Sequence, residues 1–315
     1  MDALYRVARH RERTMIEVTP LYDHDLPRLA ALWSEALARV GFACALSEKD
    51  VEEHVLLHGG EPRAILAIDP RGWLTARQGD ALVGFIHCTV GRLEMDEPET
   101  LRGVVRALVT APDAPPATAG LLLKAADVYF DGKRTLDGVI AFDLVTGYPR
   151  VAYGRGAILG EEWTLMEALG QRGFKLARRW LFYEQHFRAP IPERLPQLPG
   201  LTLFWQDSMD GHVSLVARLG ADEIASIRFI RYPQPDDCSE PLSAGLHRLD
   251  VPPERQGQGV GRWLLERGIN HLIARGVRHL FVDIPHEDGA SQARLMRMGF
   301  HESPLRGYSY ERSSP

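Results

Sequence analysis

Hydrophobic and polar positions along the chain predict two similar series of strands and helices. Residues 16–19 read as a strand, and 26–37 and 48–57 read as amphipathic helices, the second opened by Ser47 with acidic residues in its first turn. Each half then contains a predicted hairpin, around Ala76–Asp80 and around Ala217–Gly220. The pattern favours an α/β (α+β) protein.

The later parts of the two halves repeat one another as well. The segment LGQRGF ending at Phe174 echoes LMRMGF ending at Phe300, and the Tyr183-Glu184 that follows the first echoes the Tyr310-Glu311 that follows the second. Before its hairpin the second half has only LTLFWQDSMDG, whereas the first half has a strand and two helices. The sequence therefore predicts a duplication whose second copy is shorter at its start.

The stretch VPPERQGQGVGRWLL, residues 251–265, has the composition of a strand end, a glycine-rich turn and a helix start. The first N–H groups of a helix have no internal partner and lie at the positive end of its dipole, so they favour a phosphate. A Walker loop is excluded because Arg262-Trp263 stands where Lys and Ser or Thr are required, and the glycine spacing is not GxGxxG. The residues expected to face a phosphate are Gln256, Gly257, Gln258, Gly259, Val260, Gly261 and Arg262.

This stretch resembles motif A of the GNAT superfamily of N-acetyltransferases, V-x-P-x-x-[RQ]-x-x-G-x-[GA]. All five defined positions match: Val251, Pro253, Gln256, Gly259 and Gly261. Downstream, the strand around Leu280–Ile284 is followed by residues that resemble motif B, with Asp288 where Asn is usual and Leu295 where Tyr is usual; Ser291 and Gly299-Phe300 complete the match. The resemblance covers residues of roughly 200 to 313.

Taken with the repeat, the resemblance implies two tandem GNAT folds, each a mixed, mostly antiparallel twisted sheet flanked by helices. The domain order is similar to that of mycothiol synthase-like tandem enzymes. In the first copy, VTAPDAPPATAGLLL stands in place of motif A, with Ala114 at the Gln or Arg position and Ala117 and Ala119 at the glycine positions. Its prolines remove phosphate donors, so this copy is expected to be degenerate. We predict a leader at 1–14, a degenerate GNAT domain at 15–188, a proline-rich linker at 189–200 and a GNAT domain that binds acetyl-CoA at 201–315.

The resemblance also implies a site. In the family the fourth and fifth strands splay apart around the acetyl-pantetheine arm, which places Leu249 and Val251 at the cofactor, together with Asp288 and Ser291 from motif B. The base is expected to be His247 or Asp250, which strand alternation puts on opposite faces unless a bulge intervenes. Since the usual acid is replaced by Leu295, the alternatives are Tyr308 and Tyr310 on the last strand, or Tyr148 and Tyr153 reaching across from the first domain.

Residues 148–163 form a glycine-rich stretch where a short turn is expected. It reads either as a flap facing the second domain or as an ordinary surface insertion. The first domain is also expected to supply the wall over the acceptor that the shorter second copy lacks.

Charge and composition indicate which partners, metal sites and cellular location to expect. The net charge of −5 with scattered Lys and Arg predicts neither a nucleic-acid partner nor a membrane surface. The three cysteines Cys44, Cys88 and Cys238 are far apart, which predicts reduced thiols and no metal site. Without an apolar spanning run or a visible signal peptide, a cytoplasmic location is expected.

The sequence therefore predicts an acetyl-CoA-dependent N-acetyltransferase that acts on an amine, expected to be a small molecule. The alternative is a non-catalytic acyl-CoA-binding sensor, which Leu295 favours. Acyl length, acceptor identity and oligomeric state, a homodimer included, stay open.

Overall fold

The computed structural model of the protein describes residues 15–39, 45–56, 64–93, 96–133, 136–148, 156, 158–159, 163–207, 212–231 and 242–313. In the first half the strands are β1 (Ile16–Pro20), β2 (Ala64–Leu66), β3 (Trp73–Gln78), β4 (Ala81–Leu93), β5 (Arg102–Thr110), β6 (Gly138–Ala141), β7 (Ile158–Leu159) and β8 (Lys175–His186). Its helices are α1 (Leu26–Arg39), α2 (Glu48–Val51), α3 (Thr118–Asp131) and α4 (Trp163–Gln171).

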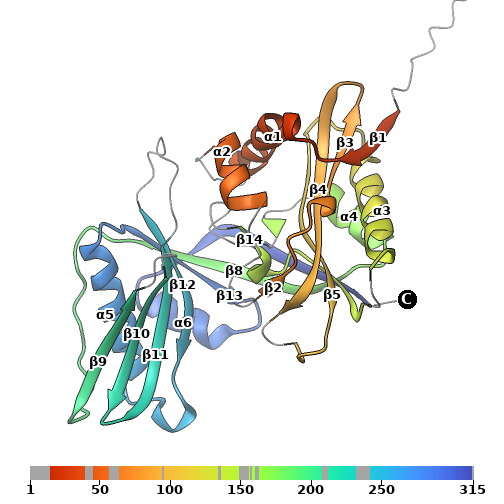
Figure 1. The fold of residues 1–315 in the computed structure, drawn as a ribbon. Coiled ribbons are helices and arrows are strands. Elements are labelled where there is room, and N and C mark those ends of the chain that lie inside the picture. Colours follow the sequence, from red (N-terminus) through yellow and green to blue (C-terminus); the bar gives the residue numbers. More distant parts are fainter. Residues whose placement is uncertain are drawn as a thin grey trace, which may run out of the picture.

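The second half follows the same order without the opening helices. Its strands are β9 (Leu201–Asp207), β10 (His212–Leu219), β11 (Asp222–Arg231), β12 (Ser243–Asp250), β13 (His279–Pro285) and β14 (His301–Ser313), and its helices are α5 (Val260–Ala274) and α6 (Gly289–Arg297). The expected α/β architecture is confirmed, since a large, mostly antiparallel sheet is flanked by helices (Figure 1).

The two halves exchange their last strands. The sheet order is β1-β3-β4-β5-β6-β14-β8-β13-β12-β11-β10-β9, so β14 pairs with β6 of the first half while β8 pairs with β13 of the second. Figure 1 shows β8, β13 and β14 running between the two halves. The order reads the same from either end once the repeats are matched, with β8 and β14 side by side at the centre. Sequence reasoning did not foresee this exchange, because the apolar pattern of a strand does not identify its neighbour.

Short-range signals are confirmed where they were strongest. Ser47 accepts a hydrogen bond from the backbone N–H of Asp50, whose carboxylate accepts one from the Ser47 backbone, and this capping box opens α2. The two hairpin turns match as well, since Gly79 and Gly220 both have φ of 61° and each turn is followed by a bulge in the second strand of its hairpin. Similar sequences thus form similar turns in the two halves.

The proline-rich segment between β8 and β9 is pinned to α5. The Asn270 side chain accepts a hydrogen bond from the Ile191 N–H (2.8 Å) and donates to its carbonyl (2.9 Å). One turn earlier, the buried carboxylate of Glu266 accepts a hydrogen bond from the Arg194 N–H (2.7 Å). These contacts hold Arg194 beside the helix that opens at the glycine-rich turn.

One hydrophobic cluster joins the two halves. It runs from the buried side chains of α1 and α2 through Tyr148, Trp180 and Phe182 to Ile230 of β11 and Phe281 of β13. A second cluster packs α5 and α6 against the other face of β10–β13, where Gly268 lets α5 approach closely because an added Cβ would lie 2.3 Å from the Phe229 ring. The first half therefore packs on one face of the second-half strands and α5 on the other.

Candidate active site at the divergence of β12 and β13

β12 and β13 run parallel for only three residue pairs and then separate. Pairing holds from Ser243 opposite His279 to Gly245 opposite Phe281. Beyond that point β12 stays paired with β11 as far as Asp250, and β13 stays paired with β8 as far as Pro285. Within the described residues, the edges that β12 and β13 turn toward each other thus have no strand partner beyond this point, which is the splay that the resemblance implied.

A β-bulge on β12 sets which side chains line this splay. The register shifts from Arg228 opposite Arg248 to Phe229 opposite Leu246, so His247 is the extra residue. Its ring is buried and lies 5.9 Å from that of His212 on β10, whose register partner is Ile230 of the interdomain cluster. Asp250 and Arg248 share this face with His247, because the bulge shifts the alternation between residues 247 and 250.

The two candidate bases sit in different surroundings. Asp250 is half exposed and forms an ion pair with Arg248, with 2.5 Å between a carboxylate oxygen and Nε. His247 is buried at the bulge. A buried imidazole beside the splay is better placed to take a proton from a group bound there than a carboxylate held by an arginine at the surface.

The glycine-rich turn leads from β12 directly into α5. Gly259 is the N-cap of the helix with φ of 82°, a left-handed conformation that favours glycine. The amide of Gln256 donates to the Val251 carbonyl and that of Gln258 to the Glu254 carbonyl, so both expected phosphate donors instead brace the turn. The N–H groups of Val260, Gly261 and Arg262 form the first turn of α5, which leaves them without intrahelical acceptors.

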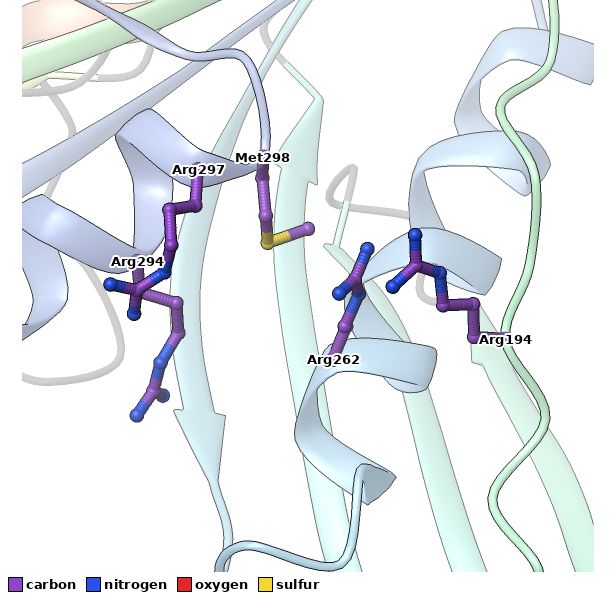
Figure 2. A pocket seen from close by; sticks show the side chains of 5 residues that line it. All are labelled: Arg194, Arg262, Arg294, Arg297 and Met298. Atoms are coloured by element: carbon purple, nitrogen blue, oxygen red, sulfur yellow. The ribbon is translucent and has the colours of Figure 1, made fainter.

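A pocket of about 440 Å³ lies beside this first turn. Figure 2 shows Arg262 of α5 and Arg194 of the linker on one side, and Arg294 and Arg297 at the end of α6 on the other, with Met298 between them. The carboxylate of Glu266 holds Arg262 in place through a hydrogen bond to Nε (2.7 Å) and also accepts from the Arg194 backbone. Four arginines against one buried carboxylate give the pocket an excess of positive charge.

Comparisons with known proteins agree with this geometry. Residues 179–300 match the model of the acetyltransferase (GNAT) family. A tandem GNAT protein from the clavulanic acid biosynthesis pathway has the same fold over 96% of this chain and 99% of its own, with a TM-score of 0.64 at 14% identity. Residues 179–300 are therefore similar to the GNAT family, and the chain as a whole has the fold of a tandem GNAT protein. A GCN5-related N-acetyltransferase from Sphaerobacter thermophilus also shares the fold, with a TM-score of 0.62 and 12% identity over 95% of both chains.

Curated relatives of this chain match over shorter stretches. The mycothiol acetyltransferase of Kocuria rhizophila is 26% identical over 149 residues, which cover 44% of this chain and 48% of that protein. The bS18-alanine N-acetyltransferase of Escherichia coli K12 is 37% identical over 67 residues, 21% of this chain and 45% of that protein. The chain thus spans about half the length of the curated relatives it matches.

The expected motif B residues Asp288 and Ser291 lie at the start of α6. Asp288 is the N-cap of α6, where its carboxylate accepts a hydrogen bond from the Ser291 N–H (3.0 Å). The hydrogen bonds from Ser291 hold the pKa of Asp288 below its usual range. Leu295 is buried in the cluster beneath α5 and α6, so this position offers no proton donor to the site.

The four tyrosines considered as acids lie elsewhere or outside the described residues. Tyr308 and Tyr310 pack into the hydrophobic cluster around α3 and α4 of the first half, and both β8 and β13 lie between β14 and β12. The strand exchange carries them there. Tyr148 is fully buried and hydrogen-bonded to Nδ1 of His87. Tyr153, and with it most of the 148–163 stretch, lies outside the described residues.

The corresponding position in the first half is filled by a charged side chain. β5 and β6 also separate after three parallel pairs, and the register of β4 and β5 skips Arg106 as that of β11 and β12 skips His247. The buried Arg106 guanidinium donates to the carbonyls of Thr146 (2.8 Å) and Gly147 (2.7 Å) and lies over the Tyr148 ring. It thereby bridges β5 to the segment that follows β6.

Sequence reasoning missed Arg106 and three of the four pocket arginines. Arg194, Arg294 and Arg297 come from a linker and from the far end of α6, which no motif joins to the glycine-rich turn. The signal available in the sequence was the cluster of Arg294 and Arg297 directly before Gly299-Phe300. Of the three cysteines, Cys88 is buried as a free thiol, and Cys44 and Cys238 lie outside the described residues.

The buried His87 beneath Arg106 predicts a pH-dependent stability. Burial, and next the charge of Arg106, hold the pKa of His87 well below its usual value. The unfolded chain therefore binds a proton that the folded chain resists, so stability is full above pH ~6.5 and falls as the pH drops below it, by up to about 1.4 kcal/mol per pH unit. Urea unfolding of wild type at pH 7.5 and 5.5 measures this loss, which His87→Gln should reduce. The exposed His286→Gln is the matched control, and an equal loss in all three proteins would contradict the assignment to His87.

Proposed function

We propose that this protein is a GNAT-type, acetyl-CoA-dependent N-acetyltransferase that binds its cosubstrate in the second half and acetylates an amine at the face carrying His247. The observation that carries the proposal is the pocket of four arginines beside the first turn of α5, where the β12–β13 splay ends at the glycine-rich turn. Phosphates would lie against the helix N–H groups and arginines, and the acyl arm along the free edge of β12.

The residues present fit such a molecule at both ends. A chain of phosphates needs donors and positive charge, which the first turn of α5 and the arginine pocket supply. The extended arm carries amide groups, which need strand-edge partners such as the backbone of Leu249 and Val251. Because Gly259 lacks a Cβ and no other atom lies within 4 Å of that position, the approach to the turn is open.

The chemical step follows from this placement. The amine nitrogen attacks the thioester carbonyl carbon, the C–S bond breaks, and an N–C bond forms. His247 accepts the proton that the amine loses, and the departing thiolate takes up a proton from water. Since the face around His247 also carries Ser214, Arg248 and Asp250, the acceptor meets polar groups there. The cluster from α1 and α2 to Ile230 and Phe281 forms the opposite wall, which favours a small acceptor.

The first half is proposed to bind no acetyl-CoA. Arg106 bridges the gap between β5 and the residues after β6 that the acyl arm would need, and its two carbonyl acceptors would lose a charged donor if it moved. Pro115 and Pro116 remove two N–H groups from the turn before α3. Two independent features thus disfavour a second site.

A panel of small amines and short peptides tests the function. Acetyl-CoA is added to the full chain and release of the free thiol is followed against a no-amine control. Release that depends on one class of amine supports the proposal. The sensor alternative, favoured by the buried Leu295, predicts acetyl-CoA binding with release no faster than hydrolysis for every amine tested.

The arginine pocket gives a prediction about affinity. Replacing both Arg294 and Arg297 with alanine should weaken acetyl-CoA binding about 10- to 100-fold, since a hydrogen bond to a charged group contributes roughly 1.5–3 kcal/mol. Calorimetric titration measures the change. Arg267→Ala is the matched control, because Arg267 lies on α5 but pairs with Glu193 outside the pocket. Equal weakening in both proteins would contradict a specific role for the pocket.

A further inference from the structure

Side chains of one glutamate and three histidines lie on the same face of three neighbouring strands, away from the acyl site. In the register of β13, β8 and β14, His279 is opposite His186, and Glu184 is opposite both Phe281 and His301. Because directly opposed residues share a face and positions two apart on a strand do too, Glu184, His186, His279 and His301 all project to one side.

The side chains converge as well as share a face. One ligand atom from each of Glu184, His186 and His279 lies within 4.8 Å of the other two. His279 Nε2 is 3.1 Å from a Glu184 oxygen, and the rings of His186 and His279 stack with centroids 4.4 Å apart. His301 Nε2 is 3.6 Å from the other Glu184 oxygen.

This spacing is close to what a tetrahedral metal needs. Zinc binds imidazole nitrogen at about 2.0–2.1 Å and carboxylate oxygen at about 2.0–2.2 Å, which puts neighbouring ligand atoms roughly 3.4 Å apart. The Glu184–His279 pair already has such a separation, and a rotation of the exposed His186 ring brings in the third ligand. His279 is oriented through its other nitrogen, since Nδ1 lies 3.2 Å from Ser243 Oγ.

We propose that Glu184, His186 and His279 bind a divalent transition metal of the Zn²⁺ class, with the fourth position facing His301 and solvent. Imidazole with one carboxylate suits Zn²⁺ and its neighbours better than Ca²⁺ or Mg²⁺, which prefer oxygen ligands. Two ligands come from β8, the last strand of the first half, and one comes from β13 of the second half. A bound metal would therefore link β8 to β13 and stabilise the strand exchange at the centre of the sheet. The cysteine-based expectation of no metal site did not consider these residues, because they are brought together only by the pairing of β8 with β13.

Titration of ZnCl₂ into metal-free, untagged full-length protein tests the proposal. The expected result is one Zn²⁺ per chain and a higher melting temperature in its presence. His186→Gln, at an exposed position where folding tolerates the change, should weaken Zn²⁺ binding about tenfold or more. Because the site is distinct from the splay, acetyl-CoA affinity of the metal-free His186→Gln protein should equal that of wild type.

His286→Gln is the matched control, because His286 is an exposed histidine directly after β13 that belongs to no such cluster among the residues that the structure describes. It should bind Zn²⁺ as wild type does. Absence of stoichiometric binding in wild type would overturn the proposal, and so would His186→Gln and His286→Gln binding with the same affinity.

Discussion

Replacing His247 with glutamine is expected to lower kcat by about 100- to 10,000-fold, the range that a positioned general base contributes. The His247 imidazole is buried at the β-bulge, on the part of β12 that no longer pairs with β13. Glutamine keeps a polar side chain of similar length but cannot take the proton from the amine. Acetyl-CoA affinity should stay within about twofold, because the proposed phosphate contacts lie at the first turn of α5 and not at His247. Steady-state kinetics gives kcat, and calorimetric titration gives the affinity.

Asp250→Asn is the companion variant that separates the two candidate bases. If Asp250 mainly orients Arg248, Asp250→Asn should change kcat only a few-fold and leave the pH dependence of kcat unchanged. His247→Gln should instead remove the part of the pH–rate profile that reports ionisation of the base. A large loss of kcat in Asp250→Asn with a small loss in His247→Gln would show that Asp250, and not His247, is the base. Equal turnover in all three proteins would show that neither group takes the proton.

Replacing Gly259 with valine is expected to weaken acetyl-CoA binding at least 100-fold. The N-cap residue of α5 has φ of 82°, where a β-branched residue is strained by about 1–3 kcal/mol, so the turn must rearrange and its N–H groups lose their common direction. The position is exposed with no atom within 4 Å of an added Cβ, so the rest of the fold should persist. Calorimetric titration with acetyl-CoA measures the affinity, and circular dichroism checks the fold.

Ala117→Val is the matched control for this variant, because Ala117 is the N-cap of α3 at the corresponding place in the first half. Its φ of −74° accepts valine, and no cofactor is proposed there. The control should bind acetyl-CoA as wild type does. Loss of binding in Ala117→Val, or its persistence in Gly259→Val, would move the cofactor away from the α5 turn.

Local signals in the sequence predicted local structure well. The Ser47 capping box, the two hairpins ending at Gly79 and Gly220, and the turn into α5 are each specified by residues a few positions apart. The strand exchange was not predictable in this way, because the Tyr-Glu pair that β8 and β14 share and the apolar pattern of each strand do not specify which half the strand joins. That exchange is what moved Tyr308 and Tyr310 out of the candidate site.

The candidate site shows the same contrast between features specified by neighbouring residues and features that depend on distant segments. The glycine-rich turn leading into a helix was readable from the sequence because residues a few positions apart define it, and its phosphate-binding role stays a prediction. The face of β12 on which His247 and Asp250 lie depends on a β-bulge. One extra residue creates this bulge, and the alternating pattern of the sequence does not reveal it. Arg106 and Arg194 could not be assigned, since each acts across a gap formed by segments far apart in the chain.

No helix in the described part of the chain is long and apolar enough to cross a membrane.

If one half holds the cosubstrate and the other shapes the acceptor site, the deciding quantity is how many acetyl-CoA molecules each chain binds. Isothermal titration of acetyl-CoA into wild type should give one site per chain, because Arg106 bridges the splay in the first half while that of the second half opens onto the arginine pocket. Two equivalent sites per chain would contradict the division of roles between the halves, and no binding at all would contradict the proposed function.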